Sequence, residues 1–540
     1  CKITEADVDD RLDELLTLVL DTHAAVERHS RSFDADAHHA LARRAAGESV
    51  VLLKNDDALL PLAEGTRVAV IGDFAETPRY QGAGSSAVNS IKVDTFLDCL
   101  SDSGLHSVGF APGFDRQGKP EAAKQAEAVA LAAKADAVLL CLGLDEIKES
   151  EGLDRADMKL ADNQIELLQA VREANPNTVV IVNAGASLET PWLAHCKALV
   201  YGALGGQAGA GAMVDVLTGK INPGGKLAET WANAYADTPA RDHFAGPGRT
   251  VQYREGLYVG YRYYQTAGVP VAFPFGHGLS YTQFAYSDLH ADAHSATLTV
   301  TNTGDRAGAE IVQLYVAKPN AEIFRPAQEL KAFAKVQLAA GESKTVTLTL
   351  DDKAFRYRNT RTDSWEVEGG TYELRVGASS ADIRLTAAVE VIGTDALNPY
   401  AGKALPHYQS GKVQTVPDAE WETLLGRPIP DDRVKIDRNM TLGELNHGRS
   451  PLGWLVWAVL TALLNASYKK GKPDLNVLFQ YNMPLRALAK MTNGAISMGM
   501  VDGIVMEVQG FWVIGLVRVI FEAVKNVILN AQLENRLRNS

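Results

Sequence analysis

Short apolar runs separated by helical segments form the pattern of the first half of the chain. Each run is too short for a helix, is rich in β-branched residues and ends near Gly or Asn. Such runs, alternating with helices, indicate βαβ units and a mostly parallel sheet that is covered on both faces. The runs are residues 68–72, 137–144, 178–183 and 198–201.

Two helices are expected before this sheet. Residues 1–30 have apolar side chains at helical spacing, with Thr4 as a cap and acidic residues in the first turn, which is typical of an amphipathic helix. A second helix is expected near residues 37–49. It leads into the apolar segment 50–55, and Pro61 ends that segment.

The pattern changes to period two at about residue 286. Polar and apolar residues then alternate, and Gly- or Asn-containing turns separate the alternating segments. Several short strands at this spacing predict an all-β sandwich of about 100 residues. The alternating segments are 296–301, 311–316, 343–350 and 372–376.

A helical extension is expected after a Pro- and charge-rich linker at residues 398–437. Helices are predicted at 452–466, 483–500 and 511–529. The first is very apolar but shorter than the ~20 residues that span a bilayer, and the last carries charges on one side. We expect these helices to pack on the body or on another subunit. Interfacial membrane contact is the alternative. The predicted fold class is therefore a mostly parallel α/β domain, an all-β sandwich and a helical C-terminal extension.

Composition narrows the function classes. A chain of 540 residues is expected to hold three or four domains. Its net charge of −13 argues against a nucleic-acid surface. The four cysteines, at positions 1, 99, 141 and 196, have neither CxxC nor zinc spacing, so no disulfide framework, metal or other cofactor is predicted. No signal peptide is recognised, which favours a cytoplasmic location, although the chain begins at a Cys and a front portion is expected to be missing.

Three loops lie where a parallel sheet binds its ligands, beyond the carboxyl ends of the strands. They are residues 72–89, the segment around Glu151, and residues 202–211. The first contains Gly82-Ala83-Gly84-Ser85-Ser86, which lacks both the lysine of a phosphate-binding loop and the full dinucleotide fingerprint. The second is crowded with acid, and a carboxylate of raised pKa there would suit a general acid. A solvated acidic loop is the alternative interpretation.

Several motifs together resemble glycoside hydrolase family 3, the β-glucosidase family. Ser150-Glu151-Gly152-Leu153-Asp154-Arg155 is similar to the loop that carries the acid/base Glu of that family. The remaining motifs are residues 49–55, 222–227, 253–264, 273–281 and 325–333. The resemblance divides the chain into a linker helix (1–33), an α/β sandwich (34–285), a fibronectin-III-like domain (286–393), and a linker with a helical extension (394–540).

The resemblance implies a catalytic role for Glu151 as the acid/base. Glu149 is its nearest competitor, and Asp145 and Glu146 are weaker ones. Asp154 and Arg155 are expected to pair with each other or to brace the loop.

The same resemblance implies substrate contacts in the first loop. Ser85 matches a family serine that hydrogen-bonds the glycosyl unit, with a turn hydroxyl as the alternative. Arg79 and Tyr80 are expected to line the aglycone side, although Tyr80 suits packing beneath the loop equally well.

The family's nucleophile, an Asp, is not expected in this chain. It comes from a (β/α)8 barrel of about 250 residues that precedes the α/β domain. We therefore expect the acid/base-bearing portion of a retaining β-glucosidase. Its partners would be a β-glucoside or oligosaccharide and the barrel, and the apolar tail helices would suit the interface of a homo-oligomer. Two alternatives remain open, namely an inert carbohydrate-binding or assembly module and a nucleotide-binding α/β protein.

Overall fold

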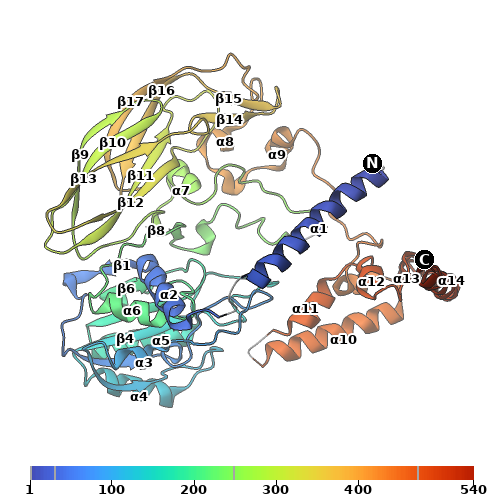
Figure 1. Ribbon diagram of the computed structural model, residues 1–540, viewed down its shortest axis with the longest axis horizontal. Helices are drawn as coiled ribbons and strands as arrows, with labels where there is room; N and C mark the ends of the chain where they lie inside the picture. Colours follow the sequence, from blue (N-terminus) through green and yellow to red (C-terminus); the bar gives the residue numbers. More distant parts are fainter. Residues whose placement is uncertain (1–2, 29–31, 247–249, 471–472, 540) are drawn as a thin grey trace.

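The computed structural model describes residues 3–28, 32–246, 250–470 and 473–539. Residues 1–2 and 29–31 of the expected linker helix lie outside these ranges. Three parts follow one another along the chain: an α/β layer, a β sandwich and a set of helices (Figure 1). The predicted fold class is confirmed.

The six strands of the α/β layer form one sheet in the order β1-β6-β5-β4-β2-β3. β1 runs antiparallel to β6, and the other neighbours are parallel. β3 was not predicted. It lies at the edge, where half-exposed residues and a glycine replace the apolar run of a central strand. The strands are β1 (Val51–Asn55), β2 (Arg67–Ile71), β3 (His106–Ala111), β4 (Ala137–Gly143), β5 (Thr178–Asn183) and β6 (Ala198–Tyr201).

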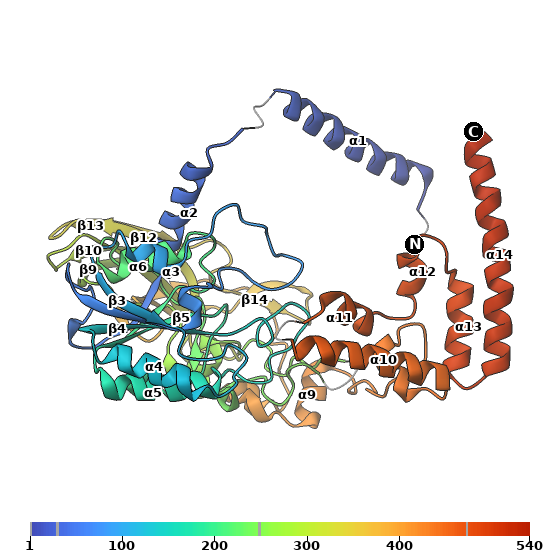
Figure 2. The same ribbon diagram turned by 90° about the horizontal axis from the view of Figure 1, so that it is seen from below.

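Helices cover both faces of this sheet. α4 and α5 lie together on one face, and α3 and α6 lie with α2 on the other (Figure 2). The bounds are α2 (Ala35–Ser49), α3 (Phe96–Leu100), α4 (Ala122–Ala132), α5 (Asp162–Ala174) and α6 (Gly209–Leu217).

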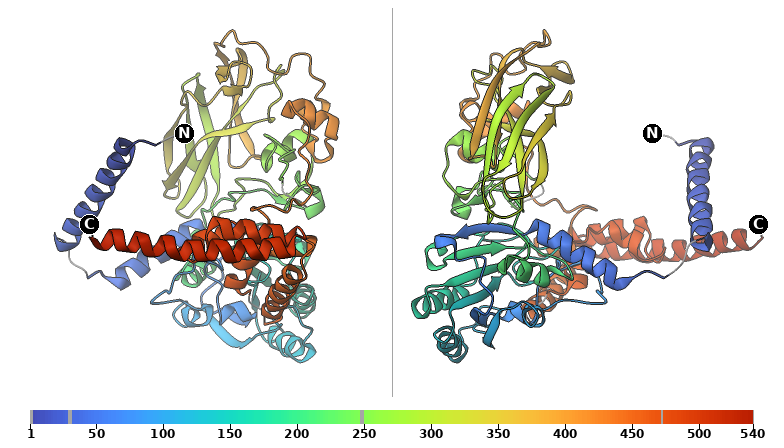
Figure 3. Two further views of the ribbon diagram at one scale, coloured as in Figure 1. Left: turned by 90° about the vertical axis from the view of Figure 1, so that its right-hand side faces the viewer. Right: turned by 60° about the vertical axis from the view of Figure 1, so that its left-hand side comes forward.

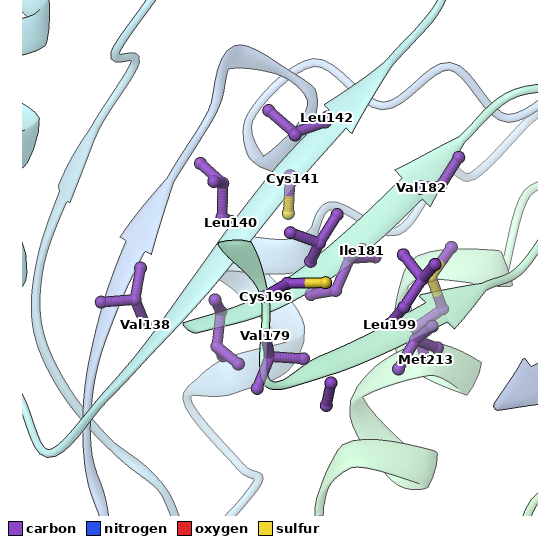
Figure 4. Close-up of a cluster of buried hydrophobic side chains, with 14 of the residues drawn as sticks. Val138, Leu140, Cys141, Leu142, Val179, Ile181, Val182, Cys196, Leu199 and Met213 are labelled. Carbon is purple, nitrogen blue, oxygen red and sulfur yellow. The ribbon is translucent and has the colours of Figure 1, made fainter. Parts of the chain in front are cut away.

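The core lies along β4 and β5, whose residues are all buried. Each fully buried Val or Leu side chain there contributes roughly 1.5–3 kcal/mol of transfer free energy. Cys141 and Cys196 pack in this cluster beside Ile181 (Figure 4). Both are free thiols, and burial raises the pKa of each to about 12.

The sandwich consists of a three-stranded sheet, β13-β10-β9, and a four-stranded sheet, β12-β11-β16-β17. Residues of β10 alternate strictly between half-buried and buried, because successive side chains of a strand point to opposite faces. The strands are β9 (Phe284–Ala291), β10 (Ser295–Asn302), β11 (Gly308–Ala317), β12 (Glu329–Leu338), β13 (Ser343–Thr349), β16 (Gly370–Gly377) and β17 (Ile383–Val391).

Smaller elements join these parts, and some lie in the expected linker. There, Tyr408 is fully buried and its hydroxyl donates to the Arg254 carbonyl at 2.9 Å. The segment around Tyr408, within the Pro- and charge-rich stretch, thus packs against the rest of the protein. The smaller elements are β7 (Trp231–Ala232), α7 (Tyr261–Ala267), β8 (Val271–Phe273), β14 (Arg356–Asn359), β15 (Ser364–Val367), α8 (Pro406–Ser410) and α9 (Asp418–Leu425).

The extension is helical, as predicted, but one predicted helix is wrong. Residues 483–500 form two helices, because Asn493 and Gly494 adopt left-handed backbone angles and Ser497 caps a new helix. The last two helices form an antiparallel hairpin (Figure 3). The helices are α10 (Pro451–Tyr468), α11 (Leu475–Asn482), α12 (Ala487–Met491), α13 (Met498–Val508) and α14 (Trp512–Asn539).

Three helices carry apolar surface that the described residues leave uncovered, and one of them is α14, where Val513, Val517 and Phe521 are exposed. α1 (Glu5–Arg28) has no buried residue and lies apart from the body (Figure 2). α10 has 18 residues, three more than the predicted helix, and a mean hydropathy of 1.3. Within the described chain, it is the one helix whose length and composition would suffice to cross a membrane, a test that core helices of soluble proteins also pass.

Candidate functional site

The three loops expected to bind a ligand meet at the carboxyl edge of the parallel strands. The Glu151 amide donates to the Ala83 carbonyl at 2.9 Å, which joins the loop after β4 to the loop after β2. The Gly206 amide donates to the Tyr80 carbonyl at 2.9 Å, which joins the loop after β6 to the same segment. The topology therefore brings the predicted loops into direct contact.

Glu151 is exposed, and its carboxylate is held by a single residue of the neighbouring loop, Ser85. Its carboxylate accepts hydrogen bonds from the Ser85 hydroxyl at 2.7 Å and from the Ser85 amide at 2.5 Å. Both hydrogen bonds lower the pKa of Glu151, and the bond from the Ser85 hydroxyl has the larger effect. In this arrangement the ionised carboxylate is favoured, whereas a general acid needs the opposite shift.

A glycine permits this close approach. A Cβ atom on Gly84 would lie 2.4 Å from Oε2 of Glu151, and the φ angle of +137° at Gly84 disfavours other residues. Gly84 belongs to the first of the three loops that were expected to lie where a parallel sheet binds its ligands. In the structure, what it approaches is the candidate acid/base itself.

Glu149, the nearest competitor, is committed to the framework of the loop. Its carboxylate accepts hydrogen bonds from the Arg79 guanidinium and from the Gly185 amide at 2.9 Å. Arg79 also donates to the Glu149 carbonyl at 2.7 Å and to the Leu144 carbonyl at 3.2 Å. The Arg79 side chain is only 2% exposed, so in this chain it braces the acidic loop from beneath. This position differs from the expected one on the aglycone side.

The other candidates hold the loop from different sides. Asp145 is buried, accepts hydrogen bonds from the Ile147 and Lys148 amides, and has a pKa raised by that burial. Arg155 donates to the Ser187 carbonyl at 3.1 Å, which supports its expected bracing role. Tyr80 is half-buried, and its hydroxyl accepts a hydrogen bond from Gln81 at 3.0 Å.

A pocket of about 650 Å³ opens beside Glu151, with Ser85 and Gly152 on the same wall. Its opposite wall comes from α11, α12 and the segment between them, which the sequence did not associate with the site. The residues of that wall are Leu475, Asn476, Leu478, Phe479, Asn482, Met483, Pro484, Ala487 and Met491. No helix was predicted at residues 475–482, and no local signal shows that this segment lies against a loop more than 300 positions earlier.

Among residues 3–28, 32–246, 250–470 and 473–539, no group of three or more His, Cys, Asp or Glu side chains is placed to hold a metal ion. The polar groups of the site are carboxylates, a hydroxyl and backbone amides. This set suits proton transfer and hydrogen bonding to a polar substrate.

The chain is similar to known proteins in its sequence and its domains. Residues 50–281 match the glycosyl hydrolase family 3 C-terminal domain, and residues 310–380 match a fibronectin type III-like domain. An exo-α-(1→6)-L-arabinopyranosidase of Bifidobacterium breve is 43% identical over 414 residues, which are 74% of this chain and 55% of that protein. A thermostable β-glucosidase B of Acetivibrio thermocellus is 43% identical over 385 residues, 68% of this chain and 50% of that protein.

A solved structure shows the same architecture. The family 3 β-glucosidase of Bifidobacterium adolescentis is similar with a TM-score of 0.70 and 39% identity, over 84% of this chain and 62% of that one. Residues 1–393 alone cannot supply that share, so part of the helical extension is matched as well. The chain spans about half the length of the curated relatives named above. By its matched domains, its relatives and its fold, the chain belongs to glycoside hydrolase family 3 and corresponds to the C-terminal portion of that family's enzymes.

Proposed function

We propose that this chain is the acid/base-bearing portion of a retaining β-glucosidase that hydrolyses terminal β-D-glucosides. The observation that carries the proposal is the exposure of the Glu151 carboxylate, compared with the other acidic side chains of the loop. Its carboxylate is exposed beside a pocket, whereas the neighbouring Glu149 and Asp145 are engaged by the framework of the loop.

The proposed reaction needs a second carboxyl group about 5–5.5 Å from Glu151. In this family an Asp of the (β/α)8 barrel attacks the anomeric carbon, while the acid gives its proton to the leaving oxygen. The same residue, now a carboxylate, then takes a proton from the water that cleaves the glycosyl-enzyme bond. Glu151 would perform both proton transfers.

Docking of the barrel would also raise the pKa of Glu151. Ser85 lowers that pKa in the chain described here, so the first step is disfavoured. A like charge nearby and the exclusion of water both raise a carboxyl pKa. The proposal therefore requires the barrel both for its nucleophile and for protonation of Glu151, and we expect the chain alone to be inactive or nearly so.

Reconstitution with the barrel supplied in trans tests the assignment. Glu151→Gln should abolish hydrolysis of aryl glucosides with poor leaving groups, and azide should rescue Glu151→Ala on an activated substrate. Glu146→Gln, a change of the same kind on the same loop, is the matched control and should retain activity. Unchanged hydrolysis by Glu151→Gln would exclude the acid/base role.

Two other functions give different results in the same experiment. An inert carbohydrate-binding module would bind oligosaccharides but gain no activity with the barrel. The arabinopyranosidases among the relatives favour a second substrate, a terminal α-L-arabinopyranoside. A comparison of aryl β-D-glucoside with aryl α-L-arabinopyranoside hydrolysis by the reconstituted enzyme separates these sugars.

A further inference from the structure

The pocket beside Glu151 has two chemically different walls. One wall is polar and consists of Glu151, Ser85 and Gly152. The other, from the helical extension, is mainly apolar. A volume of about 650 Å³ lies in the range of small-molecule sites, in which apolar lining is combined with a few oriented polar groups.

The apolar wall is fixed in place by buried neighbours. Leu478 is 7% exposed, and a Cβ atom on Gly152 would lie 3.0 Å from its Cδ2 atom, so α11 packs tightly on the acidic loop. The Asp474 side chain caps α11 by accepting from the Asn476 and Val477 amides. The Met483 carbonyl accepts from the Leu442 amide at 3.1 Å. The wall is thus a packed part of the fold.

Two large apolar side chains of this wall remain open to the pocket. Phe479 is 56% exposed and Met491 is 55% exposed, although Leu478, next to Phe479 in the chain, is buried. An aromatic ring and a thioether make favourable contacts with flat or flexible apolar groups, and methionine adapts to different shapes.

We propose that this wall binds the apolar aglycone, an aryl or alkyl group, of the glucoside whose glycosidic oxygen Glu151 protonates. The inference rests on the proposed function. An acid that protonates the leaving oxygen lies next to the group attached to that oxygen, so the pocket at Glu151 is the place for the leaving group. An apolar wall there favours apolar leaving groups over a second sugar.

The binding step can be observed without catalysis, because this chain supplies both walls of the pocket. The chain has eight methionines, and Met483 and Met491 line the pocket. With ¹³C-methyl methionine, titration with phenyl β-D-glucoside should shift the methyl signals of these two residues saturably. Methyl β-D-glucoside at the same concentrations should not shift them. Individual Met→Leu substitutions assign the signals.

The substitution Phe479→Ala should weaken phenyl glucoside binding about fivefold to tenfold, as expected for the loss of one aromatic contact. Met491→Gln is a second variant at the same wall and should weaken binding in the same direction. The matched control is Phe521→Ala on α14, where Phe521 is 65% exposed on an apolar helix face remote from the pocket lining. That control should leave the titration unchanged.

Three results would overturn the proposal: no shift of Met483 and Met491, equal shifts with methyl β-D-glucoside, or equal effects of Phe479→Ala and Phe521→Ala. The outcome is separate from that of the proposed function. Azide rescue at Glu151 can succeed while phenyl glucoside leaves the methionines unaffected, and the reverse result would show an apolar site without the acid/base.

Discussion

Arg79 is the side chain whose removal should damage the acidic loop most. We consider Arg79→Met, which keeps the length of the side chain and removes its charge and donors. The variant leaves the Glu149 carboxylate, 17% exposed, with the Gly185 amide as its remaining hydrogen-bond donor. It also removes the donor to the Leu144 carbonyl and the donor to the Glu149 carbonyl.

The expected cost follows from burial of the pair. Removing one partner of a buried ion pair leaves an uncompensated charge and typically costs about 3–5 kcal/mol of unfolding free energy. For a domain of this size, each kcal/mol lowers the melting temperature by roughly 2–4 °C. Arg79→Met should therefore lower the melting temperature of the α/β domain by roughly 6–20 °C.

Calorimetry of the full chain measures this shift, and hydrogen exchange of the β4 amides assigns the transition to the α/β domain. Arg433→Met is the matched control, because Arg433 is 88% exposed and its partner Asp431 is 49% exposed. Such a surface pair contributes about 0–1 kcal/mol. Adding Glu149→Gln to Arg79→Met should recover part of the loss, because it removes the unpaired charge.

A loss below about 1 kcal/mol for Arg79→Met, which is no more than a surface pair contributes, would refute this reasoning. It would mean that water or another group replaces the guanidinium without cost, and that the bracing role assigned to Arg79 is incorrect. A double variant no more stable than Arg79→Met would refute the explanation by an unpaired charge.

Two further predictions concern the contact between Ser85 and Glu151. Ser85→Ala should raise the pKa of Glu151 toward its ordinary value of 4.5, as read from the ¹³C carboxyl shift. The hydrogen bonds from Ser85 depress the pKa of Glu151 in the folded state. The destabilisation caused by Ser85→Ala should therefore be largest above pH 4.5 and should vanish as the pH falls through the folded-state pKa. A stability difference that does not change with pH would contradict this origin. Gly84→Ala should displace Glu151 and reduce hydrolysis by the reconstituted enzyme on the order of tenfold or more. Gly206→Ala, at a φ of +72° with no atom within 4 Å of the added carbon, should retain activity, and equal losses in both variants would exclude the steric explanation.

The sequence predicted those strands and loops whose signals are local. The four apolar runs correspond to β2, β4, β5 and β6, because a central parallel strand is buried on both faces and needs apolar residues throughout. β3 was not predicted, because an edge strand does not need apolar residues at every position. The break after Met491 was also not predicted, because its cause, two left-handed residues, disturbs the apolar spacing very little.

The site was predictable only in part, for the same reason. Motif position predicted Glu151 and Ser85 as candidate site residues, and the structure brings them into hydrogen-bond contact. Burial of Arg79 depends on Glu149, 70 positions later, and the wall formed by Phe479 depends on chain folding over a much longer range. Neither pairing has a sequence signal of its own, because side chains that meet by tertiary packing need no fixed spacing.

The separation between the two walls of the pocket has a consequence for biosynthesis. Glu151 and Phe479 are 328 positions apart. At the ordinary rates of translation, roughly 15–65 s pass between the synthesis of one wall and that of the other. Domains generally fold as units during synthesis, so the α/β layer and the sandwich can fold before the extension leaves the ribosome. A transcript truncated after the sandwich would then yield a folded product with Glu151 in place and its pocket open on one side.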